Sequence, residues 1–185
     1  YNNNDGVIYT TGLRFTNIQI PKNAQINKAF IVIDCYYPHN PGYGINNNVV
    51  TRIYAEDADN PATFSSGSSP RSRTTTTSYV TWNLNSVWYD HSYYETPSLT
   101  TLVQSLVNRS GWTSGNSMVF LIKDDPTNLD YREIRTIDSD PSHAPKLYIE
   151  YQNSGNGTIT SSAITLASIH GATSWGRLIW DEEGT

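Results

Sequence analysis

The chain has 185 residues, a formal net charge of −5 and only 16% charged side chains. This length suits one domain, which can bury roughly 70% of the surface that its unfolded chain exposes, so folding requires no disulfide or metal. The acidic balance, with no basic run longer than RSR at residues 71–73, argues against nucleic acid as a partner. No apolar stretch approaches the ~20 residues of a membrane-spanning helix.

The composition favours an extracellular or cell-surface protein, because Asn, Ser, Thr and Tyr are abundant and Lys is scarce. The single cysteine, Cys35, has no partner for an internal disulfide, and we expect it to be a small buried strand residue. Sequons at Asn108 and Asn156 matter only in a host that glycosylates them. Because residue 1 is Tyr, we expect a processed chain or an excerpt.

The first half of the chain predicts four strands. Alternation in TGLRFTNIQI indicates a half-buried strand that Pro21 should end. A longer strand is expected in AQINKAFIVIDCYY and a third in VVTRIYAED, separated by the Pro-, Gly- and Asn-rich loop PHNPGYGINNN. After a long polar connection, the β-branched and aromatic segment TTTTSYVTWNL predicts the fourth. The next segment, VWYDHSYYE, should be an aromatic loop or a short strand.

One short helix is predicted by apolar residues at helical spacing, which are Leu99, Leu102, Val103, Leu106 and Val107. Thr96 is the expected N-cap, with Pro97 at the first helical position and Gly111 closing the helix. Its apolar face should pack against one end of a sandwich. Three more strands are expected, in NSMVFLIKDD, REIRTIDS and PKLYIEYQ. The pattern predicts an all-β, antiparallel, jelly-roll-like sandwich over residues 1–152, with one short α-helix.

Five segments in this order resemble the DNRLRE-type β-sandwich module, which is related to some carbohydrate-binding modules. They are GLRFTNIQIPKNAQINKAFIVIDCY, RIYAEDADNPATF, VTWNL, TPSLTTLVQSLVNRSGWTSGNSMVFLIKDD and APKLYIEY. The resemblance covers roughly Gly12 to Tyr151 and implies a non-catalytic jelly roll of large secreted and surface proteins of bacteria and archaea. Members usually have more strand sequence before the first segment, so Val7 to Tyr9 should supply at most an abbreviated strand.

Residues 153–185 lie outside this module and predict a two-stranded extension. The segment GTITSSAITLASI alternates like a strand, with Ile159, Ile164 and Leu166 as its packing residues. Two interpretations remain open: the start of a following module, or a strand that adds to a sheet edge of another copy of the chain. The second would make the chain a building block of a filament.

The sequence contains none of the common catalytic or metal-binding motifs, but some of its loops are rich in carboxylates. GxSxG, HExxH, GxxxxGK and CxxC are absent, and the four histidines lie in separate segments without metal-ligand spacing, so we expect a non-enzyme that requires no cofactor. Carboxylates in the loops offer the oxygen ligands that calcium prefers, above all Glu56, Asp57 and Asp59, with DSD at residues 138–140 as a second source. Turn formation is the alternative explanation for these residues.

Aromatic residues are the other candidate site. Trp88, Tyr89, Tyr93 and Tyr94 lie close together in one segment, and exposed rings can stack on the apolar faces of sugars or serve protein interfaces. The alternative is that these rings belong to the core. The sequence therefore predicts a non-catalytic extracellular structural or adhesive module that assembles with other copies of itself or with adjacent modules. A polysaccharide-binding module of a larger secreted protein is the alternative.

Overall fold

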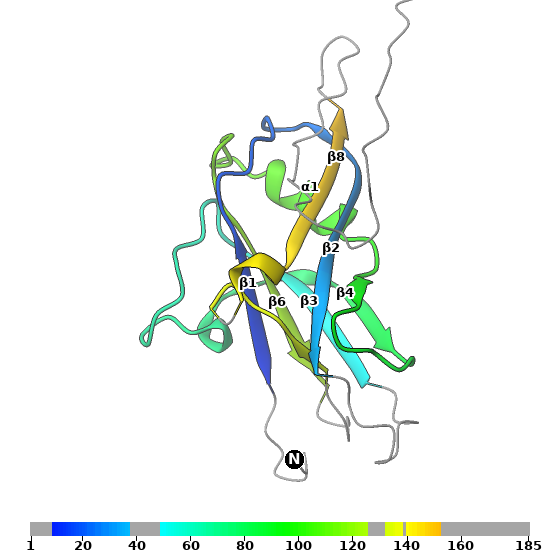
Figure 1. Ribbon diagram of the computed structural model, residues 1–185. Coiled ribbons are helices and arrows are strands. Elements are labelled where there is room, and N and C mark those ends of the chain that lie inside the picture. Colours follow the sequence, from blue (N-terminus) through cyan, green and yellow to red (C-terminus); the bar gives the residue numbers. More distant parts are fainter. Residues whose placement is uncertain (1–8, 38–48, 126–131, 139, 153–185) are drawn as a thin grey trace, which may run out of the picture.

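The computed structural model describes residues 9–37, 49–125, 132–138 and 140–152. They form two antiparallel sheets and one short α-helix (Figure 1), so the predicted all-β sandwich is confirmed. The elements are β1 (Thr10–Phe15), β2 (Gln25–Tyr37), β3 (Val49–Glu56), the 3-10 turn η1 (Pro70–Ser72), β4 (Thr75–Leu84), β5 (Tyr93–Glu95), α1 (Thr100–Val107), β6 (Met118–Asp124), β7 (Glu133–Ile134), the 3-10 turn η2 (Pro141–His143) and β8 (Lys146–Gln152). The predicted extension at 153–185 lies outside the described residues.

The first sheet has the strand order β1-β6-β3-β4. In the second sheet β2 is the central strand, with β5 along one side and β8 and β7 along the other. All of these pairs are antiparallel. Most connections cross from one sheet to the other, and β3–β4 is a pair of consecutive strands within the first sheet. This crossing brings residues far apart in sequence into one core.

The core lies between the inner faces of the sheets, and β2 shows how the sequence builds it. Ile31, Ile33 and Cys35 point inward and are fully buried, which confirms the expected place of the cysteine. Ile26 is also buried, although it has the opposite parity. The register shift between Ile26 and Lys28 explains this, because one extra residue in a strand exchanges its two faces.

Helix α1 packs against β2 and β3 and closes one end of the sandwich (Figure 1). Its buried residues, Leu102, Val103, Leu106 and Val107, are four of the five predicted from helical spacing. Gln104 fixes the helix to the start of β2, because its amide donates to the Ala24 carbonyl at 2.9 Å and accepts from the Ile26 N–H at 2.8 Å.

Both predicted helix ends are wrong. The helix begins at Thr100, with Leu99 at the N-cap position, because Thr96 is instead bound to β2: its hydroxyl oxygen accepts from the Ile31 N–H at 3.0 Å. At the other end the helix stops at Val107. Gly111 does not close the helix but allows the Asp59 carboxylate to lie close to the main chain, since a β-carbon there would collide with that carboxylate.

Two predicted strands are shorter than expected. The first ends at Phe15 and not at Pro21, because Asn17 adopts a left-handed backbone with φ of 56° that leaves the ladder. The strand predicted in REIRTIDS is reduced to Glu133–Ile134. After it the chain turns, and the Asp140 N–H bonds the Thr136 carbonyl at 2.9 Å.

The connection between β3 and β4 covers part of the outer face of the first sheet. Gly12 of β1 makes room for it, because a β-carbon there would meet the Phe64 ring. Arg73 holds the connection in shape: its guanidinium donates to the carbonyls of Ala62 at 3.0 Å and Thr63 at 2.9 Å and lies 4.9 Å from the Phe64 ring centre. This cover explains why Leu121, on the outer face opposite Gly12, is fully buried.

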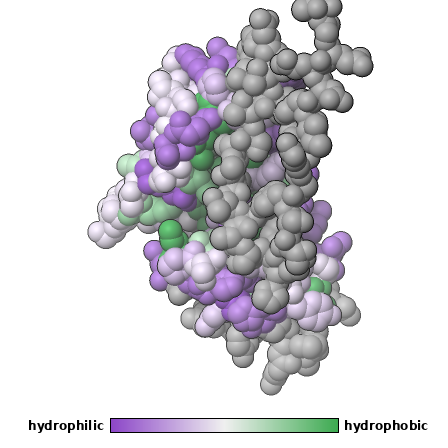
Figure 2. All heavy atoms as spheres, turned by 45° about the horizontal axis from the view of Figure 1, so that its top comes forward, coloured by the Kyte–Doolittle hydropathy of each residue, from purple (hydrophilic) through white to green (hydrophobic). Residues whose placement is uncertain are grey.

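Among the residues coloured in Figure 2, hydrophilic ones predominate, and green hydrophobic residues show in smaller areas between them. Among the described residues, no helix has the length and apolar character needed to cross a bilayer.

Candidate functional site

The carboxylates proposed for calcium are bound to arginines. Glu56 is buried, and both of its carboxylate oxygens accept from Arg73 Nη1, at 2.9 and 3.1 Å. With side-chain exposures of 7% for Arg73 and 9% for Glu56, this pair is screened little by solvent. Glu56 therefore serves to anchor the connection between β3 and β4.

Asp57 and Asp59 share a different partner, Arg109 at the end of α1. Arg109 Nε donates to Asp59 Oδ1 at 2.6 Å, and Arg109 Nη1 contacts Asp57. The hydrogen bond that Arg109 donates to Asp59 is the main reason that the pKa of Arg109 is raised above its usual value. The described structure does not bring Glu56, Asp57 and Asp59 together as one ligand set. Calcium binding there stays a prediction that would require breaking these ion pairs.

The aromatic segment divides between core and surface. Trp88 is 3% exposed and its ring stacks on Tyr94, with centroids 4.1 Å apart and planes 4° apart. Tyr94 also accepts a hydrogen bond from the Tyr89 N–H at 2.8 Å, whereas the Tyr89 side chain is 64% exposed. Tyr93 points to the opposite side of β5, beside Asp34. The four rings therefore do not form one exposed platform, and from the surface a glycan could reach Tyr89 but not the face of Trp88 that stacks on Tyr94.

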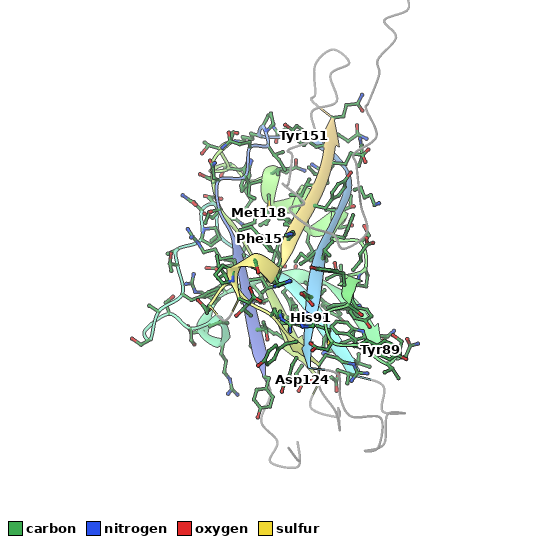
Figure 3. The ribbon with its side chains drawn as sticks, viewed as in Figure 1. Phe15, Tyr89, His91, Met118, Asp124 and Tyr151 are labelled. Atoms are coloured by element: carbon green, nitrogen blue, oxygen red, sulfur yellow. The ribbon has the colours of Figure 1, made fainter. Side chains whose placement is uncertain are left out.

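A cavity of about 350 Å³ lies between the two sheets, on the inner side of Trp88. It is at the end of the sandwich where β2 and β6 finish, which Figure 3 marks by Asp124 near the bottom of the view. Its lining is mostly apolar, with a few polar side chains, and consists of Tyr9, Thr11, Ile33, Val49, Thr51, Trp82, Leu84, Trp88, Ile122, Asp124, Arg132, Glu133 and Ile134. Six strands contribute residues to this lining.

The aromatic rings that line the cavity differ in their exposure to solvent. Trp82 and Trp88 are nearly buried, and their centroids are 5.5 Å apart with planes tilted by 50°. Tyr9, just before β1, is 49% exposed and stands at the outer part of the lining. Arg132 is positioned by hydrogen bonds from its Nη2 to the carbonyls of Leu84 at 3.3 Å and Ser86 at 3.1 Å. The cavity thus combines buried indole rings with a charged, partly accessible rim.

A separate polar cluster covers the outer face of β2. Arg135 is its centre: Nη1 lies 3.3 Å from Asp34 Oδ1 and 2.5 Å from the Cys35 carbonyl, and Nη2 lies 3.2 Å from Asp90 Oδ1. Both Arg135 and Asp34 are buried, at 5% and 1% exposure. Asp34 is on β2 and Asp90 precedes β5, so the cluster links three segments.

Two neighbours of the cluster have shifted pKa values. Burial, and then the negative charge of Asp34, raise the pKa of Tyr93 above 10.0, so its hydroxyl stays protonated at neutral pH. Hydrogen bonds from Ser142 and His143 lower the pKa of Asp140 from 3.8 to about 2, so this carboxylate is ionised at any physiological pH.

No protein-family model matches the chain. A comparison with curated proteins likewise gives no match. The resemblance to the DNRLRE-type module therefore stays a prediction from the sequence.

The sequence predictions missed the cavity and the polar cluster. The cavity draws one or two residues from each of six strands, and their spacing in sequence carries no motif. The cluster did leave one signal, which is Asp34 within the apolar run AFIVIDCYY, because a charged residue in a buried strand needs a partner. The partner, Arg135, is 101 residues away.

The two arginine pairings predict different stabilities. We expect Arg73→Ala to lower the free energy of unfolding by about 3–5 kcal/mol, because it leaves the buried Glu56 carboxylate without a cation. Arg109→Ala is the matched control, and its loss should be about 1 kcal/mol or less, since Asp57 and Asp59 are partly solvated. Urea unfolding followed by tryptophan fluorescence measures both. Equal losses would contradict the anchoring role of Arg73.

Proposed function

We propose that the chain is a non-catalytic binding module of a secreted or surface protein, and that it takes the end of a carbohydrate chain into the cavity between the sheets. The observation that carries this proposal is the cavity itself. A mostly apolar pocket with a few placed polar groups is the usual form of a small-molecule site, and ~300–1,000 Å³ is its usual size. At about 350 Å³ the cavity is near the lower limit, so it suits a terminal sugar and not a long segment.

The chemistry of the lining supports a sugar. The C–H faces of a pyranose can pack on indole and phenol rings, here Trp82 and Tyr9, while hydroxyl groups need hydrogen-bonding partners. Thr51, Asp124 and Glu133 supply such groups within the same lining. The composition, rich in Asn, Ser, Thr and Tyr, and the resemblance to carbohydrate-binding modules favour the same class of ligand.

Tyr9→Ala tests the cavity and Tyr89→Ala is its matched control, because both rings are exposed, at 49% and 64%, and only Tyr9 lines the cavity. The protein is first screened on a glycan array, and the affinity for the best glycan is then measured by calorimetry. We expect Tyr9→Ala to weaken binding about tenfold, which is about 1.4 kcal/mol, and Tyr89→Ala to leave it unchanged.

If Tyr89→Ala weakens binding and Tyr9→Ala does not, the glycan binds at the exposed Tyr89 and not in the cavity. An array without any hit would refute carbohydrate binding.

A second function, assembly by strand addition, is favoured by β4. Among the described strands β4 is an edge of the first sheet, and its ten residues TTTSYVTWNL contain no charge, Pro or Gly. Natural edge strands usually carry such residues, because an unprotected edge pairs with other strands. A β-branched segment such as GTITSSAITLASI, with Ile159, Ile164 and Leu166, suits that edge on another copy. That segment lies outside the described residues.

For this second function we expect the full chain to form polymers and a chain ending at Gly155 to remain monomeric, as measured by analytical ultracentrifugation. Two lysines on the edge, Thr77→Lys and Asn83→Lys, should prevent assembly of the full chain without unfolding it, because both positions are exposed. Polymers that survive both changes would show that β4 is not the docking edge.

A further inference from the structure

The polar cluster on the outer face of β2 contains two histidines. Asp34, His91 and His143 each offer one potential ligand atom, and these three atoms lie within 4.8 Å of one another. They come from β2, from the segment before β5 and from η2, so their sequence spacing gives no metal motif. Figure 3 shows His91 beside β2, and the ring centroids of His91 and His143 are 5.9 Å apart.

His143 is held in the orientation that a metal-binding histidine requires. Its Nδ1 lies 2.7 Å from Asp140 Oδ2, and Ser142 Oγ donates to Asp140 Oδ1 at 2.6 Å. Asp140 Oδ2 is placed to accept a proton from Nδ1, and this tautomer leaves a lone pair on Nε2. That Nε2 lies 4.0 Å from Asp34 Oδ2. A carboxylate that fixes the far nitrogen of a histidine ligand is the usual support in protein metal sites.

Asp34 is the observation that points to a ligand. Its Oδ1 is within reach of Arg135, but its Oδ2 is buried and has no hydrogen-bond partner. A buried carboxylate oxygen without a partner is costly, because it has lost water and gained nothing in return. This oxygen is on the same side as His143 Nε2, so a cation between them would satisfy it.

The charge of the surroundings also favours a cation, even though Arg135 is present. Asp34, Asp90 and Asp140 carry three negative charges around the single positive charge of Arg135. With neutral histidines the cluster is left with two uncompensated negative charges, which one divalent ion neutralises. Arg135 Nη2 lies 3.2 Å from His91 Nε2 and 3.2 Å from Asp90 Oδ1, so it keeps a carboxylate partner when His91 turns to a metal.

We propose that Asp34, His91 and His143 form a binding site for a zinc ion. Two imidazoles and one carboxylate are a common set of protein ligands for zinc, in which a fourth position takes water or another ligand. Ligand atoms of a tetrahedral site are about 3.4 Å apart, so atoms that now lie within 4.8 Å of one another must approach by up to about 1.4 Å. The His91 side chain is 64% exposed and has room for this movement.

A zinc ion here would join β2, the segment before β5 and η2 across the outer face of the second sheet. Ile33 lines the cavity on the inner face of β2, whereas Asp34 lies on its outer face, so the zinc site is independent of carbohydrate binding. The exposed side of His91 leaves the fourth position open to solvent.

Zinc titration of the full chain at neutral pH, by calorimetry, tests the proposal. We expect one ion per chain, with binding at least about tenfold weaker in His91→Gln, His143→Gln and Asp34→Asn, and about 10–100-fold weaker in Asp140→Asn. Cobalt absorption provides a second readout: the bands of a four- or five-coordinate ion should appear in the native chain and disappear in His143→Gln.

The chain's other two histidines give the control. A His39→Gln/His170→Gln double variant should bind zinc as tightly as the native protein. Both ligand histidines are at least partly exposed, so their variants should fold and decide the matter even if Asp34→Asn does not fold. Failure of the native chain to bind zinc, or binding that survives His91→Gln and His143→Gln, would overturn the proposal.

Discussion

The buried ion pair between Asp34 and Arg135 is the constraint around which the second sheet is organised. Taking two charges out of water costs several kcal/mol per ion, and the pair repays this only when additional hydrogen bonds satisfy the remaining groups. Arg135 meets that need with the Cys35 carbonyl and Asp90, and its main-chain N–H also bonds the Asp34 carbonyl at 3.0 Å. The segments that carry these partners must therefore fold over β2.

The two faces of β2 consequently differ in chemistry. Ile33 contributes to the apolar cavity, whereas Asp34, the next residue, belongs to the polar cluster. Successive side chains of a strand point to opposite faces of the sheet. Two unlike sites can therefore be neighbours in sequence and still lie on opposite sides of β2. Apolar residues in place of both Asp34 and Arg135 would pack here at little cost in stability, so the charges point to a role beyond packing.

Regular features of the fold could be predicted from the sequence, because period-two and helical alternation in segments such as AFIVIDC and residues 99–107 report burial directly. The ends of the elements could not be predicted, because they depend on tertiary contacts. Thr96 accepts a hydrogen bond from the Ile31 N–H, and Gly111 lies against the Asp59 carboxylate. The functional sites could not be predicted either, for a related reason. The acidic residues chosen for calcium are satisfied by arginines far away in sequence, and Trp88 is buried by Tyr94. His91 and His143 meet only through the packing of η2 over β2.

Hydrogen exchange of the Asp34→Leu/Arg135→Met double variant tests the organising role of the ion pair most directly. Replacing both charges with apolar side chains should leave overall stability nearly unchanged, because the desolvation cost disappears with the attraction. The account predicts faster amide exchange around His91 and His143, with β3 and β6 as protected as in the native chain. Unchanged protection around both histidines would contradict it.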